Sequence, residues 1–259
     1  MSKYLARKSV FAAFLCAFLS VTVFAADIKE VVKNAKASYY TLQGQGLRTF
    51  KCTVTPNWQK FLEDVEHKPL APDNPKLKLL KPVRFSVSID EQGQSKITPF
   101  TTTGEKIDPS LDQMISGFQD MLSGFYQTWT SMVLSGPFSE SESGLTLQQE
   151  GDNYRILGKD GGSDVEIKLT RDYLITEMKA TIEGSIIDMF PKFAKTDKGL
   201  LMTSIDSDIN HGQQRVAFEI KYQEIQGISL PGQVSIRVTL PTQVIAVEIT
   251  FGNYEVSKR

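Results

Sequence analysis

The chain has 259 residues, of which 41% are hydrophobic and 23% charged, and its net charge is −1 at pH 7. A chain of this length can bury a full hydrophobic core, and its nearly balanced charge lacks the basic excess of nucleic-acid-binding proteins, so we expect no nucleic-acid partner. Its two cysteines are Cys16 and Cys52; because Cys16 lies in a segment that we expect to be removed, no internal disulfide is expected.

The first 25 residues have the pattern of a secretory signal peptide. A basic start containing Lys3 and Arg7 precedes an apolar run from Val10 to Val23, and small residues follow at the cleavage positions. An uncleaved membrane anchor is the alternative interpretation, but the run is short for a membrane span. We therefore expect cleavage after Ala25 or Ala26 and a periplasmic or secreted protein.

The mature chain is predicted to begin with a helix, a strand and a second helix. Asp27 is a suitable cap for a helix whose apolar residues repeat at helical spacing as far as Leu42. Leu47–Thr55 alternates as a strand, and Cys52 falls on its apolar face. This position favours a small buried residue, whereas the alternative, a reactive thiol, needs a basic partner. Asn57 then caps a short helix.

The following segment is predicted to be a loop and a hairpin. Residues 67–82 contain four prolines, each of which removes a backbone donor, and we therefore expect a loop there. Arg84–Asp90 and Gln94–Phe100 alternate as two strands around a turn at residues 91–93.

Ser110–Leu134 is predicted to be one long helix. Asp108 and Pro109 suit its start, and Gly136 suits its end. Steps of three and four residues place ten apolar side chains on one face. The opposite face has no Lys or Arg, so it is suited to water rather than to an anionic membrane surface. The apolar stripe consists of Leu111, Met114, Ile115, Phe118, Met121, Leu122, Phe125, Trp129, Met132 and Val133.

From Leu145 to Val256, short alternating segments separated by turns predict a run of antiparallel strands. Ile186–Phe193 interrupts the alternation with Pro191 and is predicted to be a short helix or a loop. The sequence therefore predicts a single α+β domain, residues 26–259, in which the long helix lies on a curved antiparallel sheet of about ten strands.

No segment has the residue pattern of a catalytic or metal site. His67 and His211 have no partner at metal-ligand spacing, and neither a phosphate-binding loop nor a nucleophile elbow occurs. Residues 206–212 match a calcium loop at three positions, but His211 occupies the glycine position and a strand precedes the segment, so a polar turn is favoured. We expect no catalytic residue, no metal and no cofactor; an enzyme with scattered acidic residues is one alternative.

A connection between two strands near the C-terminus carries a resemblance to a known family. Tyr222, Gly227 and Pro231 lie in this connection. Together with the signal peptide, the N-terminal helix and the strands interrupted by a long helix, it resembles the outer-membrane lipoprotein carrier and sorting proteins of bacteria, over roughly Asp27–Val256. The resemblance implies an open antiparallel half-barrel with helices covering its concave face and acyl chains bound between sheet and helices.

On this basis the long helix is predicted to contact a hydrophobic ligand, either an acyl chain or a lipidated protein, with transient membrane contact. The helix must move to admit it, and Gly104 and Gly136, which flank it, are the predicted hinges. The alternative is a non-catalytic module of the cell envelope with a solid core, which binds a protein partner at a sheet edge. The predicted ligand-binding residues are Met114, Phe118, Met121, Leu122, Phe125, Trp129 and Met132.

Overall fold

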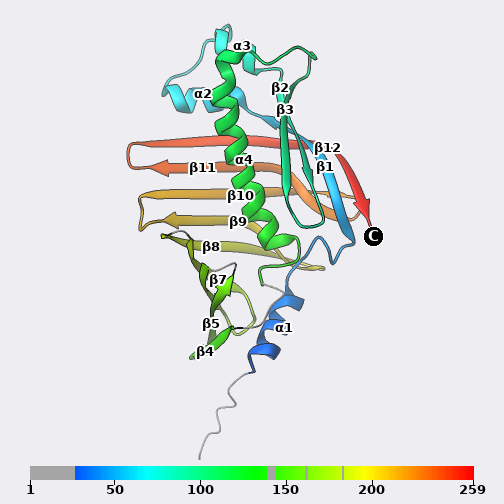
Figure 1. The fold of residues 1–259 in the computed structure, drawn as a ribbon, viewed down its shortest axis with the longest axis vertical. Coiled ribbons are helices and arrows are strands. Elements are labelled where there is room, and N and C mark those ends of the chain that lie inside the picture. The colour runs from blue at the N-terminus through cyan, green and yellow to red at the C-terminus, as the bar shows by residue number, and fades with distance from the viewer. Residues whose placement is uncertain (1–26, 139–143, 161–162, 183) are drawn as a thin grey trace, which may run out of the picture.

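The strands form one open antiparallel sheet of twelve strands. The computed structural model describes residues 27–138, 144–160, 163–182 and 184–259, and the predicted signal peptide lies outside these ranges. The order of strands in the sheet is β3-β2-β1-β12-β11-β10-β9-β8-β7-β6-β5-β4 (Figure 1). The strands are β1 (Leu47–Pro56), β2 (Val83–Ile89), β3 (Ser95–Thr101), β4 (Thr146–Glu150), β5 (Asn153–Asp160), β6 (Ser163–Leu169), β7 (Ile175–Ile182), β8 (Ser185–Thr196), β9 (Gly199–Ile209), β10 (Gln214–Ile225), β11 (Ile228–Leu240) and β12 (Gln243–Lys258).

The helices begin where the sequence supplies caps. The Asp27 carboxylate accepts from the Lys29 backbone N–H at 3.0 Å, and the Asp108 carboxylate accepts from that of Ser110 at 2.8 Å. Among the described residues, no helix has both the length and the apolar character needed to cross a membrane. The helices are α1 (Ile28–Ser38), α2 (Trp58–Glu66), α3 (Pro75–Leu80) and α4 (Asp112–Val133), the last preceded by the 3₁₀ turn η1 (Pro109–Leu111).

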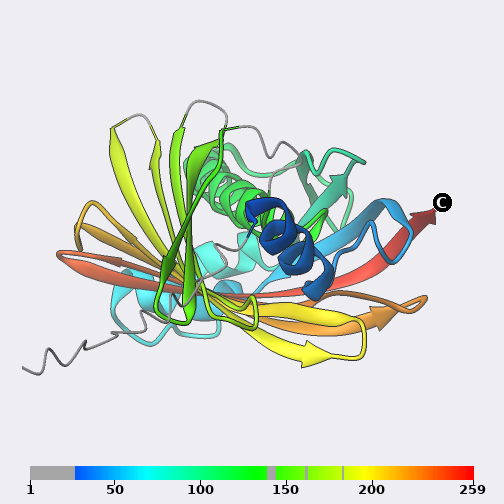
Figure 2. The ribbon, with the colours of Figure 1, turned by 90° about the horizontal axis from the view of Figure 1, so that it is seen from below.

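α4 packs across one face of the sheet, which we call the inner face. The Phe118 and Phe85 rings are stacked with centroids 5.1 Å apart, and the Phe125 ring meets that of Phe218 edge-on at 5.6 Å. In Figure 2, β9–β12 run beneath α4 while β4–β7 stand beside it. Aromatic side chains therefore fix the long helix to β2, next to one edge of the sheet, and to β10, in its middle.

The segment predicted to be a proline-rich loop contains a helix. α3 forms because the Asn74 side chain accepts from the Leu77 N–H at 3.1 Å, and because Pro75 is preorganised for the first helical position. Leu80 is fully buried, whereas Leu79 is 42% exposed. The prolines of this segment therefore lie before, at the start of and after a short helix, and they do not prevent it.

The segment around Pro191, predicted to be a helix or loop, is strand β8. Pro191 pairs with Ile205 of β9, next to an irregularity in register between Lys192 and Phe193. A strand tolerates proline beside such an irregularity, because the ladder is already locally disrupted there. The sheet consequently has twelve strands, where the sequence predicted about ten.

Candidate functional site

The central part of the α4 stripe is packed as core. Five of the seven side chains predicted to contact a ligand are almost completely enclosed between α4 and the sheet, and each exposes at most 3% of its surface. The side chains enclosed in this way are Phe118, Leu122, Phe125, Trp129 and Met132. Met114 and Met121 differ, because both are half-buried at the edge of this contact.

Two polar contacts fix α4 to the inner face. The Trp129 indole N–H donates to the Tyr222 hydroxyl at 3.1 Å, and that hydroxyl donates to the Met202 carbonyl at 2.6 Å. Burial raises the pKa of Tyr222, so its hydroxyl stays protonated at neutral pH and serves as the donor. The Tyr126 hydroxyl lies 3.4 Å from the Cys52 sulfur. These bonds satisfy polar atoms that α4 buries, so detaching the helix would leave them unpaired.

Cys52 is a buried residue, as its place in the strand indicates. It exposes 2% of its surface, and burial raises the pKa of its thiol to about 11. A thiol with this pKa is protonated at neutral pH, whereas a reactive cysteine needs thiolate character and access. The packing interpretation of Cys52 therefore fits the structure better than the reactive one.

One flank of α4 contacts the β2–β3 hairpin. The Gln119 side-chain amide donates to the Ile97 carbonyl at 3.1 Å, and the Thr130 hydroxyl lies 3.4 Å from the Gly93 carbonyl oxygen. At 3.6 residues per turn, Met114 and Met121 lie on the opposite flank. Figure 1 shows β2 and β3 on one side of α4 and the hairpin ends of β9–β12 extending beyond its other side. The two half-buried methionines therefore border the part of the inner face that α4 leaves uncovered.

A continuous row of inner-face residues crosses this part of the sheet, and we call it the inner strip. It takes one residue from each strand from β4 to β12, and each residue pairs in register with the next. Its members are Leu147, Ile156, Ile167, Met178, Met189, Ser207, Val216, Val238 and Ile245. Eight of these nine residues are apolar, so the strip is a hydrophobic path across nine strands.

The inner strip is incompletely covered. The neighbouring row beneath α4, formed by Ile205, Phe218, Ile236 and Val247, exposes at most 6% of any residue. In contrast, five members of the strip are only half-buried, namely Leu147, Met189, Val216, Val238 and Ile245. The other four members, Ile156, Ile167, Met178 and Ser207, are buried. Burial therefore falls beside α4 at β8 and β10–β12 and at the edge strand β4, whereas β5–β7 and β9 keep their strip residues covered.

The opposite, outer face of the same strands is charged. Arg155 forms a bidentate pair with Glu166 at 2.7 and 2.8 Å, Lys168 contacts Glu177 at 2.8 Å, and Lys179 Nζ lies 3.0 Å from an Asp188 oxygen. The hydrogen bond from Arg155 holds the pKa of Glu166 below its usual value. The two faces of β5–β8 therefore differ, because one carries ion pairs and the other carries the apolar strip.

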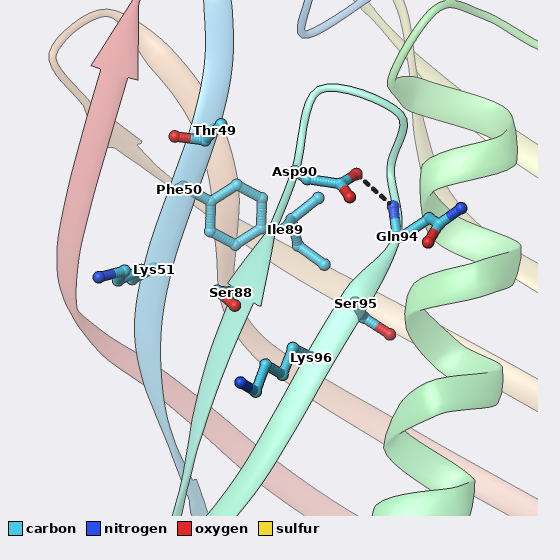
Figure 3. A pocket seen from close by; sticks show the side chains of 9 residues that line it. All are labelled: Thr49, Phe50, Lys51, Ser88, Ile89, Asp90, Gln94, Ser95 and Lys96. Atoms are coloured by element: carbon cyan, nitrogen blue, oxygen red, sulfur yellow. Dashed lines mark hydrogen bonds between the residues drawn. The ribbon is translucent and has the colours of Figure 1, made fainter.

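Two pockets in the described structure lie away from the contact between α4 and the sheet. The larger, about 440 Å³, lies beside the β2–β3 hairpin (Figure 3). Its outward-facing wall includes Lys51, Ser88 and Lys96, which pair in register on β1, β2 and β3. Asp90 is engaged within the turn, where its carboxylate accepts from the Gln94 N–H at 2.8 Å. The smaller pocket lies on the outer side of β9–β11 and is lined mainly by polar residues.

The turn that resembles a calcium loop is held by its own polar contacts. The Asp208 carboxylate accepts from the Gly212 N–H and from Arg215 Nε, the latter at 3.3 Å, and the Asn210 side chain accepts from the Ile186 N–H at 3.0 Å. Within the ranges that the structure describes, no cluster of three or more His, Cys, Asp or Glu residues is arranged to hold a metal. These contacts account for Asp208 and Asn210 as turn residues.

The predicted hinge glycines both have positive φ. Gly104 has φ 78° and no neighbour within 4 Å of an added Cβ, whereas Gly136 has φ 100° and lies against Thr41. Both positions favour glycine for conformational reasons. A hinge function for them remains a prediction.

The fold and the site define a protein with an open antiparallel sheet and an apolar strip beside a docked helix. No protein-family model, curated protein or solved structure matches the chain. The strip was not predicted from the sequence. Alternation marks the inner residues of each strand, but it does not say which residue of one strand pairs with which residue of the next.

Proposed function

We propose that this protein is an exported carrier or chaperone that binds an acyl chain, of a lipid or a lipidated protein, on the inner strip beside α4. The observation that carries the proposal is the half-buried part of the strip, a row of apolar side chains bordered by Met114 and Met121. Methionine is flexible and polarisable, so it adapts to chains of different shape. The ligand would complete a hydrophobic layer that α4 covers only in part.

Burial of an acyl chain on the strip would give weak, reversible binding. Removing about 300 Å² of acyl surface from water contributes roughly 7 kcal/mol before ordering costs. This sum alone corresponds to a dissociation constant of roughly 10 µM, and association and chain ordering take back a large part of it. We therefore expect a dissociation constant above about 10 µM for a chain that buries only this area, and tighter binding for a chain that buries more.

In this proposal the sheet acts as a half-barrel and α4 lies over its concave side. The buried stripe of α4 supports the strip, and pivoting of α4 at Gly104 and Gly136 would uncover further apolar surface. The carrier would operate in the periplasm or outside the cell and would contact a membrane only while it loads or unloads. No catalytic residue takes part.

A second candidate function is a protein-interaction or structural module of the cell envelope. The observation that favours it is the dense packing of α4, in which Leu122 and Trp129 have no exposed surface. A partner strand would then pair with a free sheet edge, either β3 or β4. Such a protein would bind no lipid.

Lipid binding separates these two functions. The 259-residue chain is expressed, purified without detergent, extracted with organic solvent and analysed by mass spectrometry for bound lipid. The delipidated protein is then titrated with a pyrene-labelled acyl ester, and a monoacylglycerol is added as competitor. We expect saturable binding that the competitor reverses. Absence of both bound lipid and saturable probe binding would favour the interaction module.

A further inference from the structure

Three exposed apolar side chains lie on connected elements at one end of the molecule, and we call this region the α3 surface. Val65 of α2, Leu79 of α3 and Phe100 of β3 expose 41%, 42% and 37% of their surface. α2 packs against α3. Phe100 pairs in register with Arg84, whose guanidinium donates to the Lys81 carbonyl at the end of α3 at 2.8 Å. Figure 1 shows α2, α3 and the open end of the β2–β3 hairpin together, at the end of the molecule away from α1.

The same region is basic in a chain that is slightly acidic. Residues 68–84 contain five basic residues and one acidic residue, a net charge of +4, whereas the whole chain carries −1. With the acidic residues of α2 included, residues 58–84 still carry +2. Two of the lysines lie 3.3 and 3.7 Å from the Glu66 carboxylate. Lys78 and Lys81 are exposed and form no ion pair with any residue that the structure describes, so both cations beside Leu79 can meet an anionic surface.

This combination of charge and apolar side chains fits the surface of an anionic bilayer. Lysine and arginine residues are attracted to anionic lipid over about a Debye length, and apolar side chains enter the boundary between headgroups and acyl chains. A fluid bilayer accepts Leu79 and Phe100 at any spacing, whereas a folded protein partner would need a complementary pocket for each. α3 has only six residues, so the contact would be reversible rather than a permanent anchor.

We infer that the α3 surface docks the protein on an anionic lipid membrane. The inference rests on the proposed function, because a carrier of acyl chains must visit a membrane, and it names the surface that makes the contact. The Trp58 ring of α2 lies 4.9 Å from the Phe118 ring of α4. The α3 surface is therefore attached to the N-terminal half of α4, and docking would bring this end of the inner face, with Met114, to the bilayer.

The test measures co-sedimentation of the purified protein with phosphatidylcholine vesicles that contain either no anionic lipid or about 30% phosphatidylglycerol. We expect binding to the anionic vesicles only, and weaker binding at high salt. The double variant Lys78→Gln/Lys81→Gln should bind about tenfold more weakly or less, because each basic residue near the surface contributes roughly fivefold. Leu79→Gln should weaken binding severalfold through the loss of apolar contact.

The matched control is the double variant Lys29→Gln/Lys33→Gln. Both lysines are exposed on α1, at the end of the molecule away from α3 (Figure 1). The control removes the same charge as the α3 double variant and should bind anionic vesicles as the wild type does. All these side chains are exposed, so circular dichroism should show an unchanged fold in every variant.

The outcomes separate this inference from the function on which it rests. Equal vesicle binding by the wild type and the α3 double variant would overturn it, as would an equal loss in the α1 control, which would assign the effect to net charge. Binding to polyglutamate but not to anionic vesicles would assign the surface to an acidic protein partner instead. If the pyrene ester binds and the vesicles do not, only the α3 surface is lost. If the vesicles bind and the ester does not, the acyl-binding proposal is lost while the docking surface stands.

Discussion

Replacing Trp129 by alanine is expected to destabilise the protein by about 3–5 kcal/mol, the range observed when a buried aromatic residue is truncated. Trp129 has no exposed surface. Its ring meets those of Phe50 and Tyr126 edge-on at 6.1 and 6.2 Å, and its indole N–H donates to Tyr222. The substitution leaves a cavity and removes the donor from which the Tyr222 hydroxyl accepts, so both effects destabilise the protein.

Urea unfolding of the purified protein, followed by circular dichroism, measures this loss. Ser123→Ala, on the exposed side of α4, is the matched control and should change the free energy of unfolding by less than about 0.5 kcal/mol. A Trp129→Ala variant as stable as the wild type would show that α4 is not anchored at this position. The docking of the helix described above would then be wrong.

Introducing a lysine at Val216 is expected to weaken acyl binding at least about tenfold, because the bound chain would then cover a charged group or lose the contact altogether. Val216 is half-buried in the middle of the inner strip, between Ser207 and Val238. The flexible side chain of lysine can extend its ammonium group towards water in the unliganded protein. We therefore expect the fold to survive the substitution while the binding surface is lost.

Ala217→Lys provides the control for this experiment. Ala217 follows Val216 on β10 but lies on the outer face, opposite Asp206 of β9. A lysine there has a carboxylate nearby and does not touch the strip, so titration with the pyrene ester should give the wild-type dissociation constant. Equal binding by Val216→Lys and by the wild type would place the ligand elsewhere or exclude it.

Local signals in the sequence predicted much of the fold. The cap at Asp108 and the apolar spacing after it predicted α4 to within a few residues, since both features act within one or two helical turns. The prediction for β8 was wrong because of Pro191. Proline removes one ladder hydrogen bond, but Pro191 lies beside a register irregularity where the ladder is already disrupted, so the strand continues through it. Such an irregularity depends on the pairing of two strands and leaves no mark in one sequence.

The candidate site was only partly predictable for a related reason. Met114 and Met121 were visible in the helical pattern, but their lower burial than that of Phe118 or Trp129 depends on which flank of the helix meets the β2–β3 hairpin. The inner strip was not predictable, because alternation within one strand does not specify which residue of the next strand lies beside it; register alone places Met189 and Val216 at the two sides of Ser207.

Methyl NMR of the methionines tests acyl binding on the inner strip most directly. The chain has seven methionines; Met121 and Met189 border or belong to the half-buried surface, and Met202, 1% exposed, is an internal reference. During titration of the methyl-labelled protein with a monoacylglycerol, we expect the Met121 and Met189 signals to shift and saturate together while Met202 stays in place. Unchanged Met121 and Met189 signals at saturating lipid would contradict an acyl-binding site on the inner strip.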